Sequence, residues 1–165
     1  SSLRLGFMVV PLALADAFER TVCVTGHFAP LILQATLADF IRQGYFATHL
    51  RKMRTLYARR QAHFVDLCRK HLGEWMMVSE NDSGMQLFGR FVQPFNDRQV
   101  AEVALSYGVD AQPVSANYHI DPPQHGLLLG YARLNDRDSA AAVAALRRTF
   151  QDLEPKLPMR ERIVA

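Results

Sequence analysis

Arg4 is the residue whose type and position most clearly indicate chemistry in this chain. It stands directly before the run Leu5–Pro11, in which every residue except Gly6 is apolar. Such a run, ended by a proline, predicts a buried strand. A guanidinium at the entrance of a buried strand needs an anion or water, because burying it without a partner is costly. A phosphate would accept two parallel hydrogen bonds from it. Arg4 is therefore either a phosphate-binding residue or a surface arginine beside a strand.

The remaining reactive residue types form no catalytic or metal-binding pattern. Lys52 and Lys70 lie in a charged helical stretch and Lys156 lies in the tail. None of these lysines ends a strand inside an apolar pocket, where an amine can lose its proton and attack a carbonyl group. The six histidines and two cysteines lack the spacing of zinc ligands. We therefore expect no metal site and no covalent chemistry from this chain alone.

Composition indicates a globular protein of the cytoplasm. Hydrophobic residues make up 49% of the chain and charged residues 21%, which excludes a disordered class. The net charge of +3 makes the chain only mildly basic, which is a weak argument for nucleic-acid binding. No apolar stretch reaches the ~18 residues of a membrane helix, and the two cysteines are expected to stay reduced.

Periodicity and chain breakers predict helices followed by an α/β layer. Helical spacing begins at Pro11 and recurs over Leu31 to Gln43 and over Tyr45 to Leu72. Gly44 ends the second of these stretches and Gly73 ends the third. Further on, Asn96 or Asp97 caps a short helix, and Asp136 or Asp138 caps a final helix that runs through Phe150. Strands are expected at residues 74–79, 85–92, 109–114 and 127–134. Pro113 places the third of these strands at a sheet edge, and the alternation of strands and helices predicts a small open α/β layer.

Four segments together resemble one family of proteins. They are Leu3 to Pro11, Leu33 to Ile41 (LQATLADFI), His49 to Arg60 (HLRKMRTLYARR) and Gly126 to Ala132 (GLLLGYA). In this order they resemble the aminotransferase-like domain of MocR-type transcriptional regulators of the GntR family, which has the fold of fold-type I pyridoxal-phosphate (PLP) enzymes. The resemblance extends from residue 1 to about residue 153.

The resemblance implies a cofactor, a fold and a division into domains. Arg4 would bind the phosphate of PLP, and the Schiff-base lysine would lie a few residues before it, ahead of Ser1. We therefore expect the C-terminal portion of a fold-type I PLP-dependent transferase, inactive alone because it lacks that lysine. Residues 1–44 would end the large PLP-binding domain, residues 45–155 would form the bridging helix and the small α/β domain, and residues 156–165 would be a tail.

Two functions follow from the resemblance. The first is an effector domain that senses PLP, or its adduct with a small amino compound, within a homodimeric regulator. The second is part of a free-standing class I/II aminotransferase. In the first case DNA would bind only to an N-terminal winged-helix domain outside this chain. The cations between Arg51 and Lys70 are spread around a polar helix face, which favours a solvated or docking surface over direct DNA contact.

One residue departs from the aminotransferase pattern. Aminotransferases commonly carry an arginine for the substrate carboxylate in the strand that corresponds to Leu127 to Ala132, and Leu128 stands at that place. Arg133 follows five residues later and would point to the opposite face of a regular strand. Either the alignment is shifted or the ligand is bound differently. This departure favours the sensor over a plain aminotransferase.

Overall fold

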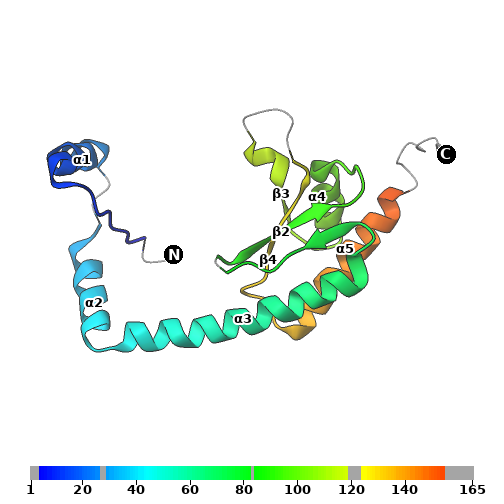
Figure 1. The fold of residues 1–165 in the computed structure, drawn as a ribbon, viewed down its shortest axis with the longest axis horizontal. Coiled ribbons are helices and arrows are strands. Elements are labelled where there is room, and N and C mark those ends of the chain that lie inside the picture. The colour runs from blue at the N-terminus through cyan, green and yellow to red at the C-terminus, as the bar shows by residue number, and fades with distance from the viewer. Residues whose placement is uncertain (1–3, 27–28, 83, 119–123, 155–165) are drawn as a thin grey trace. The chain divides into compact units, whose positions relative to one another are not determined.

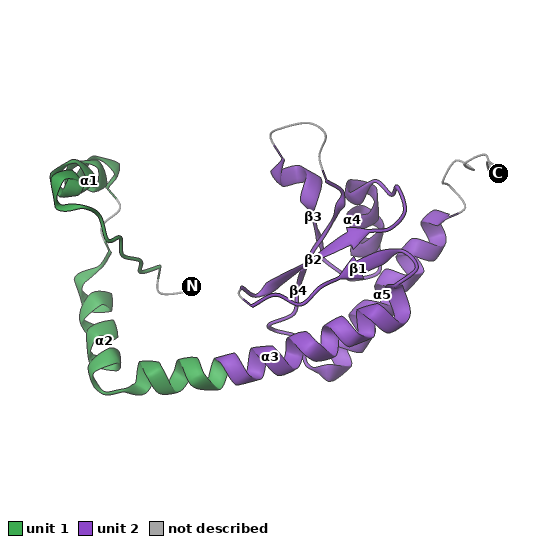
Figure 2. Cartoon of the chain, in the orientation of Figure 1, with its two compact units in different colours: residues 1–53 green, residues 54–165 purple. Residues whose placement is uncertain are grey.

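The computed structural model describes residues 4–26, 29–82, 84–118 and 124–154. The chain forms two compact units, residues 1–53 (unit 1) and residues 54–165 (unit 2), and helix α3 contributes residues to both (Figure 2). The domain boundary expected after residue 44 stays a prediction. The expected tail, residues 156–165, lies outside the described residues.

Unit 1 consists of an extended segment and helices whose ends follow local sequence signals. It holds α1 (Leu12–Thr25), α2 (Leu31–Arg42) and the first turns of α3 (Tyr45–Leu72) (Figure 1). Proline precedes α1, where its missing N–H costs nothing, and the Pro11 carbonyl accepts a hydrogen bond from the Leu14 N–H at 2.9 Å. Gly44 separates α2 from α3 at φ 77°, a conformation that glycine adopts without strain. All three helices expected in this part of the chain are confirmed.

The predicted buried strand over Leu5–Pro11 is wrong for this chain. Residues 5–10 are extended but form no strand, and Phe7 and Val9 are 91% and 89% exposed. A strand needs a neighbour that completes its backbone hydrogen bonds. The described part of unit 1 contains helices and no strand, so this segment has no sheet to join.

The helices of unit 1 also lack a core among the described residues. Neither α1 nor α2 contains a buried residue, although both carry an apolar stripe. Phe40 and Ile41, which periodicity predicts to face inward, are 36% and 52% exposed. The helical pattern was therefore sufficient to define these helices, while the surface that would cover their apolar side is not found in the described part of unit 1.

Unit 2 is built on an antiparallel sheet of four strands. The strand order is β1-β2-β4-β3, formed by β1 (Met76–Val78), β2 (Gln86–Phe91), β4 (Gly126–Gly130) and β3 (Gln112–Pro113). Pro113 cannot donate to a sheet, and β3 lies at the edge as predicted. It is shorter than expected, because Val114–Asn117 turns into a 3₁₀ helix, η1.

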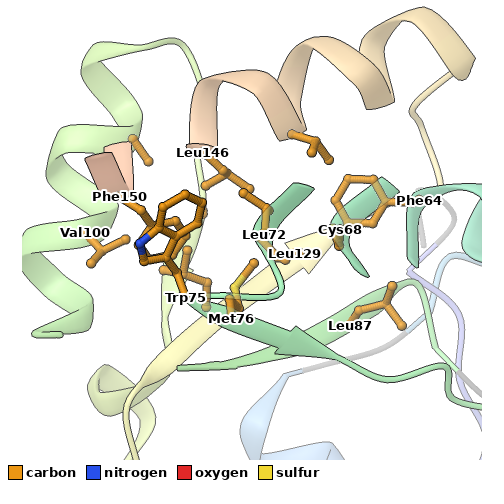
Figure 3. Packing of buried hydrophobic residues seen from close by; sticks show 14 of the residues in the cluster. Phe64, Cys68, Leu72, Trp75, Met76, Leu87, Val100, Leu129, Leu146 and Phe150 are labelled. Atoms are coloured by element: carbon orange, nitrogen blue, oxygen red, sulfur yellow. The ribbon is translucent and has the colours of Figure 1, made fainter. Parts of the chain in front are cut away.

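One face of this sheet carries the hydrophobic core of unit 2. Leu127 and Leu129 of β4 and Leu87 of β2 are buried, while the alternate residues Phe88 and Leu128 are only half-buried. The core face is packed against α3, α4 (Asp97–Ser106) and α5 (Asp136–Leu153), as Figure 3 shows. Trp75 stacks on Phe150 of α5, with ring centroids 5.8 Å apart and planes at 4°. The small α/β layer predicted from the sequence is confirmed.

The two capped helices of unit 2 begin at asparagines. The Asn96 side chain accepts hydrogen bonds from Arg98 N and Gln99 N, so of the two expected caps of α4 the first is correct. The expected caps of α5, Asp136 and Asp138, are wrong. Asn135 caps that helix by accepting from Asp138 N at 2.8 Å, which leaves both aspartates in the first turn, where the helix dipole favours negative charge.

Candidate functional site

Arg4 lies in unit 1 in a conformation that arginine rarely adopts. Its backbone has φ 51°, and among the described residues it is the only non-glycine residue with positive φ. The left-handed region costs an L-residue roughly 1–2 kcal/mol. Backbone outliers of this kind are concentrated at ligand sites, where the surrounding structure maintains them. The side chain is exposed and is therefore available to an anion.

Arg4 borders an open pocket of about 920 Å³ within unit 1. The extended N-terminal segment, α2 and the first turns of α3 supply its walls. The lining residues are Arg4, Leu5, Gly6, Phe7, Leu37, Phe40, Ile41, Phe46, His49 and Leu50. Small-molecule sites combine mostly apolar walls with a few polar groups and have volumes of roughly 300–1,000 Å³. This pocket fits that description, with Arg4 and His49 as its ionisable side chains.

An aromatic cluster forms one side of the pocket. Phe40 of α2 lies 6.4 Å from the Phe46 ring at 74° and 6.5 Å from the His49 ring at 60°. Phe46 and His49 are three residues apart on α3, a spacing that places both on the same helix face. The spacing of the histidines in the sequence does not select His49. The signal that could have found it is its place on the apolar side of the predicted helix, facing α2.

The described lysines are placed as expected for surface residues. Lys52 and Lys70 are both exposed on α3, and neither lines the pocket beside Arg4. Lys156 lies outside the described residues. The described residues also contain no group of three or more histidine, cysteine, aspartate or glutamate side chains that could hold a metal ion. None of the described helices is long and apolar enough to cross a membrane.

Leu128, at the place where aminotransferases commonly have an arginine, lies on the sheet face of unit 2 that is opposite the core. Its register partner is Phe88, and it is half-buried. Arg133 is exposed and follows the end of β4, so it is not part of the strand. Leu128 and Arg133 therefore lie at different places in unit 2, and the Leu128 side chain has no charge that could bind a ligand carboxylate.

A second polar cluster, which no pattern in the sequence indicated, surrounds Asp97 in unit 2. Its carboxylate is fully buried and accepts hydrogen bonds from Ser115 N at 2.8 Å and Ser115 Oγ at 2.6 Å. His125 Nδ1 lies 3.3 Å away and Gly126 N donates at 3.4 Å. Burial by itself raises the pKa of Asp97, but the hydrogen bonds from Ser115, His125 and Gly126 outweigh burial and lower this pKa below its ordinary value. The cluster joins α4, η1 and β4 and is a structural element of unit 2.

Comparison with known sequences finds relatives that are named as regulatory proteins. The chain is 50% identical over 153 residues to the probable rhizopine catabolism regulatory protein MocR of Rhizobium meliloti, a match that covers 93% of this chain and 31% of that protein. It is 30% identical over 152 residues to the uncharacterized HTH-type transcriptional regulator YhdI of Bacillus subtilis, covering 92% of this chain and 32% of that protein. The chain is related to MocR-type transcriptional regulators. It spans about a third of the length of these curated relatives. No protein-family model matches the sequence.

Solved structures establish the fold of this chain. The multiple substrate aminotransferase of Thermococcus profundus matches 88% of this chain and 36% of its own, with a TM-score of 0.80 and 16% identity. LysN, the α-aminoadipate aminotransferase of Thermus thermophilus, matches 91% of this chain and 38% of its own, with a TM-score of 0.79 and 18% identity. This chain therefore has the fold of the matching part of the PLP-dependent aminotransferases, which is somewhat more than a third of their length.

Proposed function

We propose that this chain is part of the PLP-binding effector domain of a MocR-type regulator, in which a small amino compound is sensed. The observation that carries the proposal is the 50% identity to the rhizopine catabolism regulator along 93% of the chain. Support also comes from the aminotransferase fold, because the LysN structure contains a phosphopyridoxyl adduct of leucine.

The proposed role of Arg4 follows from its charge, exposure and pocket. Its guanidinium would bind the cofactor phosphate through paired charge-assisted hydrogen bonds, and the apolar walls beside it suit an aromatic ring. Bound PLP supplies an aldehyde that reacts reversibly with primary amines. The residues of this chain would bind and orient the cofactor and exclude water, while DNA would be bound by an N-terminal winged-helix domain of the parent protein. Ligand binding needs to favour one arrangement of a homodimer by only a few kcal/mol to change its affinity for DNA.

Leu128 favours a sensor over an enzyme that processes amino acids. A carboxylate is best recognised by an arginine that donates two hydrogen bonds, and a half-buried leucine on the sheet face opposite the core supplies none. The second candidate function, a free-standing aminotransferase, draws its support from the fold match to LysN.

A titration of the complete parent protein with PLP tests the role of Arg4. We expect Arg4→Ala to weaken PLP binding by roughly 1.5–3 kcal/mol, the scale of hydrogen bonds to a charged group, which corresponds to about a 10- to 150-fold higher Kd. The change in cofactor absorbance on binding measures this constant. Arg20→Ala is a matched control, because Arg20 is an exposed arginine of unit 1 that does not line the pocket.

An unchanged Kd for Arg4→Ala would remove Arg4 from the site, and a parent protein that binds no PLP would refute the proposal. The two candidate functions differ in a second readout. A regulator binds operator DNA with an affinity that depends on PLP and an amine, whereas an aminotransferase converts an amino acid and an oxo acid without any effect on DNA.

A further inference from the structure

We propose that His49 is a second ligand for the cofactor phosphate and acts together with Arg4. This inference rests on the proposed function, because it concerns the same anion. Among the described residues that line the pocket beside Arg4, His49 and Arg4 are the only ones with ionisable side chains, and they come from different walls, the start of α3 and the N-terminal segment. The other described residues of this lining are apolar or glycine.

Aromatic packing fixes the position of His49 on α3. Among the described residues, no hydrogen bond involves its ring nitrogens. The ring lies at 60° to Phe40 with centroids 6.5 Å apart, and Phe40 also contacts Tyr45 at 6.0 Å and Phe46 at 6.4 Å. Aromatic contacts of this kind orient a ring through its carbon faces and edges. An imidazole held in this way can donate an N–H to an anion that enters the pocket.

A cation and a ring N–H from separate elements suit a phosphate better than a carboxylate. Phosphate offers several acceptor oxygens directed to different sides, whereas a carboxylate is satisfied by a single guanidinium fork. Among the described residues of the pocket, Arg4 alone would leave phosphate oxygens without a side-chain donor. His49 is the other described side chain of the pocket that can supply one.

The experiment compares PLP with pyridoxal, which has the same ring and aldehyde but no phosphate, in the complete parent protein. We expect His49→Phe, which keeps an aromatic ring beside Phe40, to raise the Kd of PLP about 5- to 20-fold and to leave the Kd of pyridoxal unchanged. His49→Gln retains an N–H donor and should recover part of the affinity. Lys52→Ala is the control for charge, because Lys52 is exposed three residues further along α3 and does not line the pocket.

The Arg4→Ala/His49→Phe double variant tests whether the two residues share one anion. Its effect on the Kd of PLP should be smaller than the product of the two single effects, because residues that contact the same group are coupled. If His49→Phe raises the Kd of PLP and the Kd of pyridoxal equally, or raises neither, the inference fails. An effect of Arg4→Ala on the Kd of PLP would still support the proposed function. If Arg4→Ala itself has no effect, the proposed function fails.

Discussion

At the scale of single residues, unit 2 depends on a buried charge whose hydrogen bonds are provided by segments distant in sequence. Asp97 is fully buried and accepts hydrogen bonds from Ser115, which lies in η1, and from Gly126, which begins β4. A buried carboxylate is tolerated only when its oxygens are satisfied, because desolvation of the charge is otherwise costly. The aspartate therefore holds η1 and the start of β4 against the first turn of α4.

Asp97→Asn should lower the free energy of unfolding of the chain by roughly 2–4 kcal/mol at neutral pH, because the amide loses acceptors for buried N–H and O–H groups. The difference depends on pH. The folded-state pKa of Asp97 is below its ordinary value, so its contribution is complete above about pH 4 and is lost as the pH falls through the folded pKa. Urea unfolding followed by the fluorescence of Trp75, the only tryptophan, measures both effects.

The matched control for this prediction is Asp82→Asn, at an exposed aspartate of the turn between β1 and β2. It should change stability by less than about 0.5 kcal/mol. If Asp97→Asn behaves like Asp82→Asn between pH 5 and 7, the hydrogen bonds around Asp97 contribute nothing net to stability.

At the scale of elements, two glycines of β4 look alike in sequence but differ in their surroundings. A Cβ on Gly126 would lie 2.4 Å from the Gly89 carbonyl oxygen and 2.5 Å from Cε2 of Phe88, whereas a Cβ on Gly130 would meet nothing within 4 Å. The close approach of β2, with the Phe88 ring over Gly126, therefore leaves no room for a side chain at the start of β4.

Gly126→Ala should destabilise the chain by roughly 2–3 kcal/mol through overpacking against β2, and Gly130→Ala should be neutral within about 0.5 kcal/mol. Chemical denaturation of the two variants and the wild type, with Trp75 as the probe, gives both values. Equal stabilities of the two alanine variants would show that β2 and β4 can separate to admit a methyl group.

At the scale of the whole molecule, the two units differ in how much of their apolar surface the chain itself buries. Unit 2 has a continuous core from Phe64 to Leu153, while α1 and α2 contain no buried residue. Local opening is easiest where few apolar contacts must be broken. Amide hydrogen exchange of this chain, measured by mass spectrometry, should therefore show strong protection in β2, β4 and α5 and little in α1 and α2. Equal protection of α1 and α5 would contradict this difference.

Local signals in the sequence were enough to define most elements of this fold. The bounds of α3, the break at Gly44, the edge position of Pro113 and a cap of α4 at Asn96 or Asp97 each follow from periodicity or backbone chemistry within a few residues. The apolar run after Arg4 shows the limit of such reasoning. Its composition is that of a buried strand, but a strand exists only beside another strand, and the described part of unit 1 supplies none.

The sequence by itself determined the helices and the strands of unit 2, though not the lack of a strand over residues 5–11, and it selected Arg4, because propensity, capping and charge act over short distances along the chain. Only the tertiary structure brought His49 to the pocket of Arg4 and collected Ser115, His125 and Gly126 around Asp97. Arg4 and His49 are 45 positions apart in the chain, and Ser115 is 18 positions from Asp97. Their geometry is set by how the elements pack, and no local pattern in the sequence encodes it.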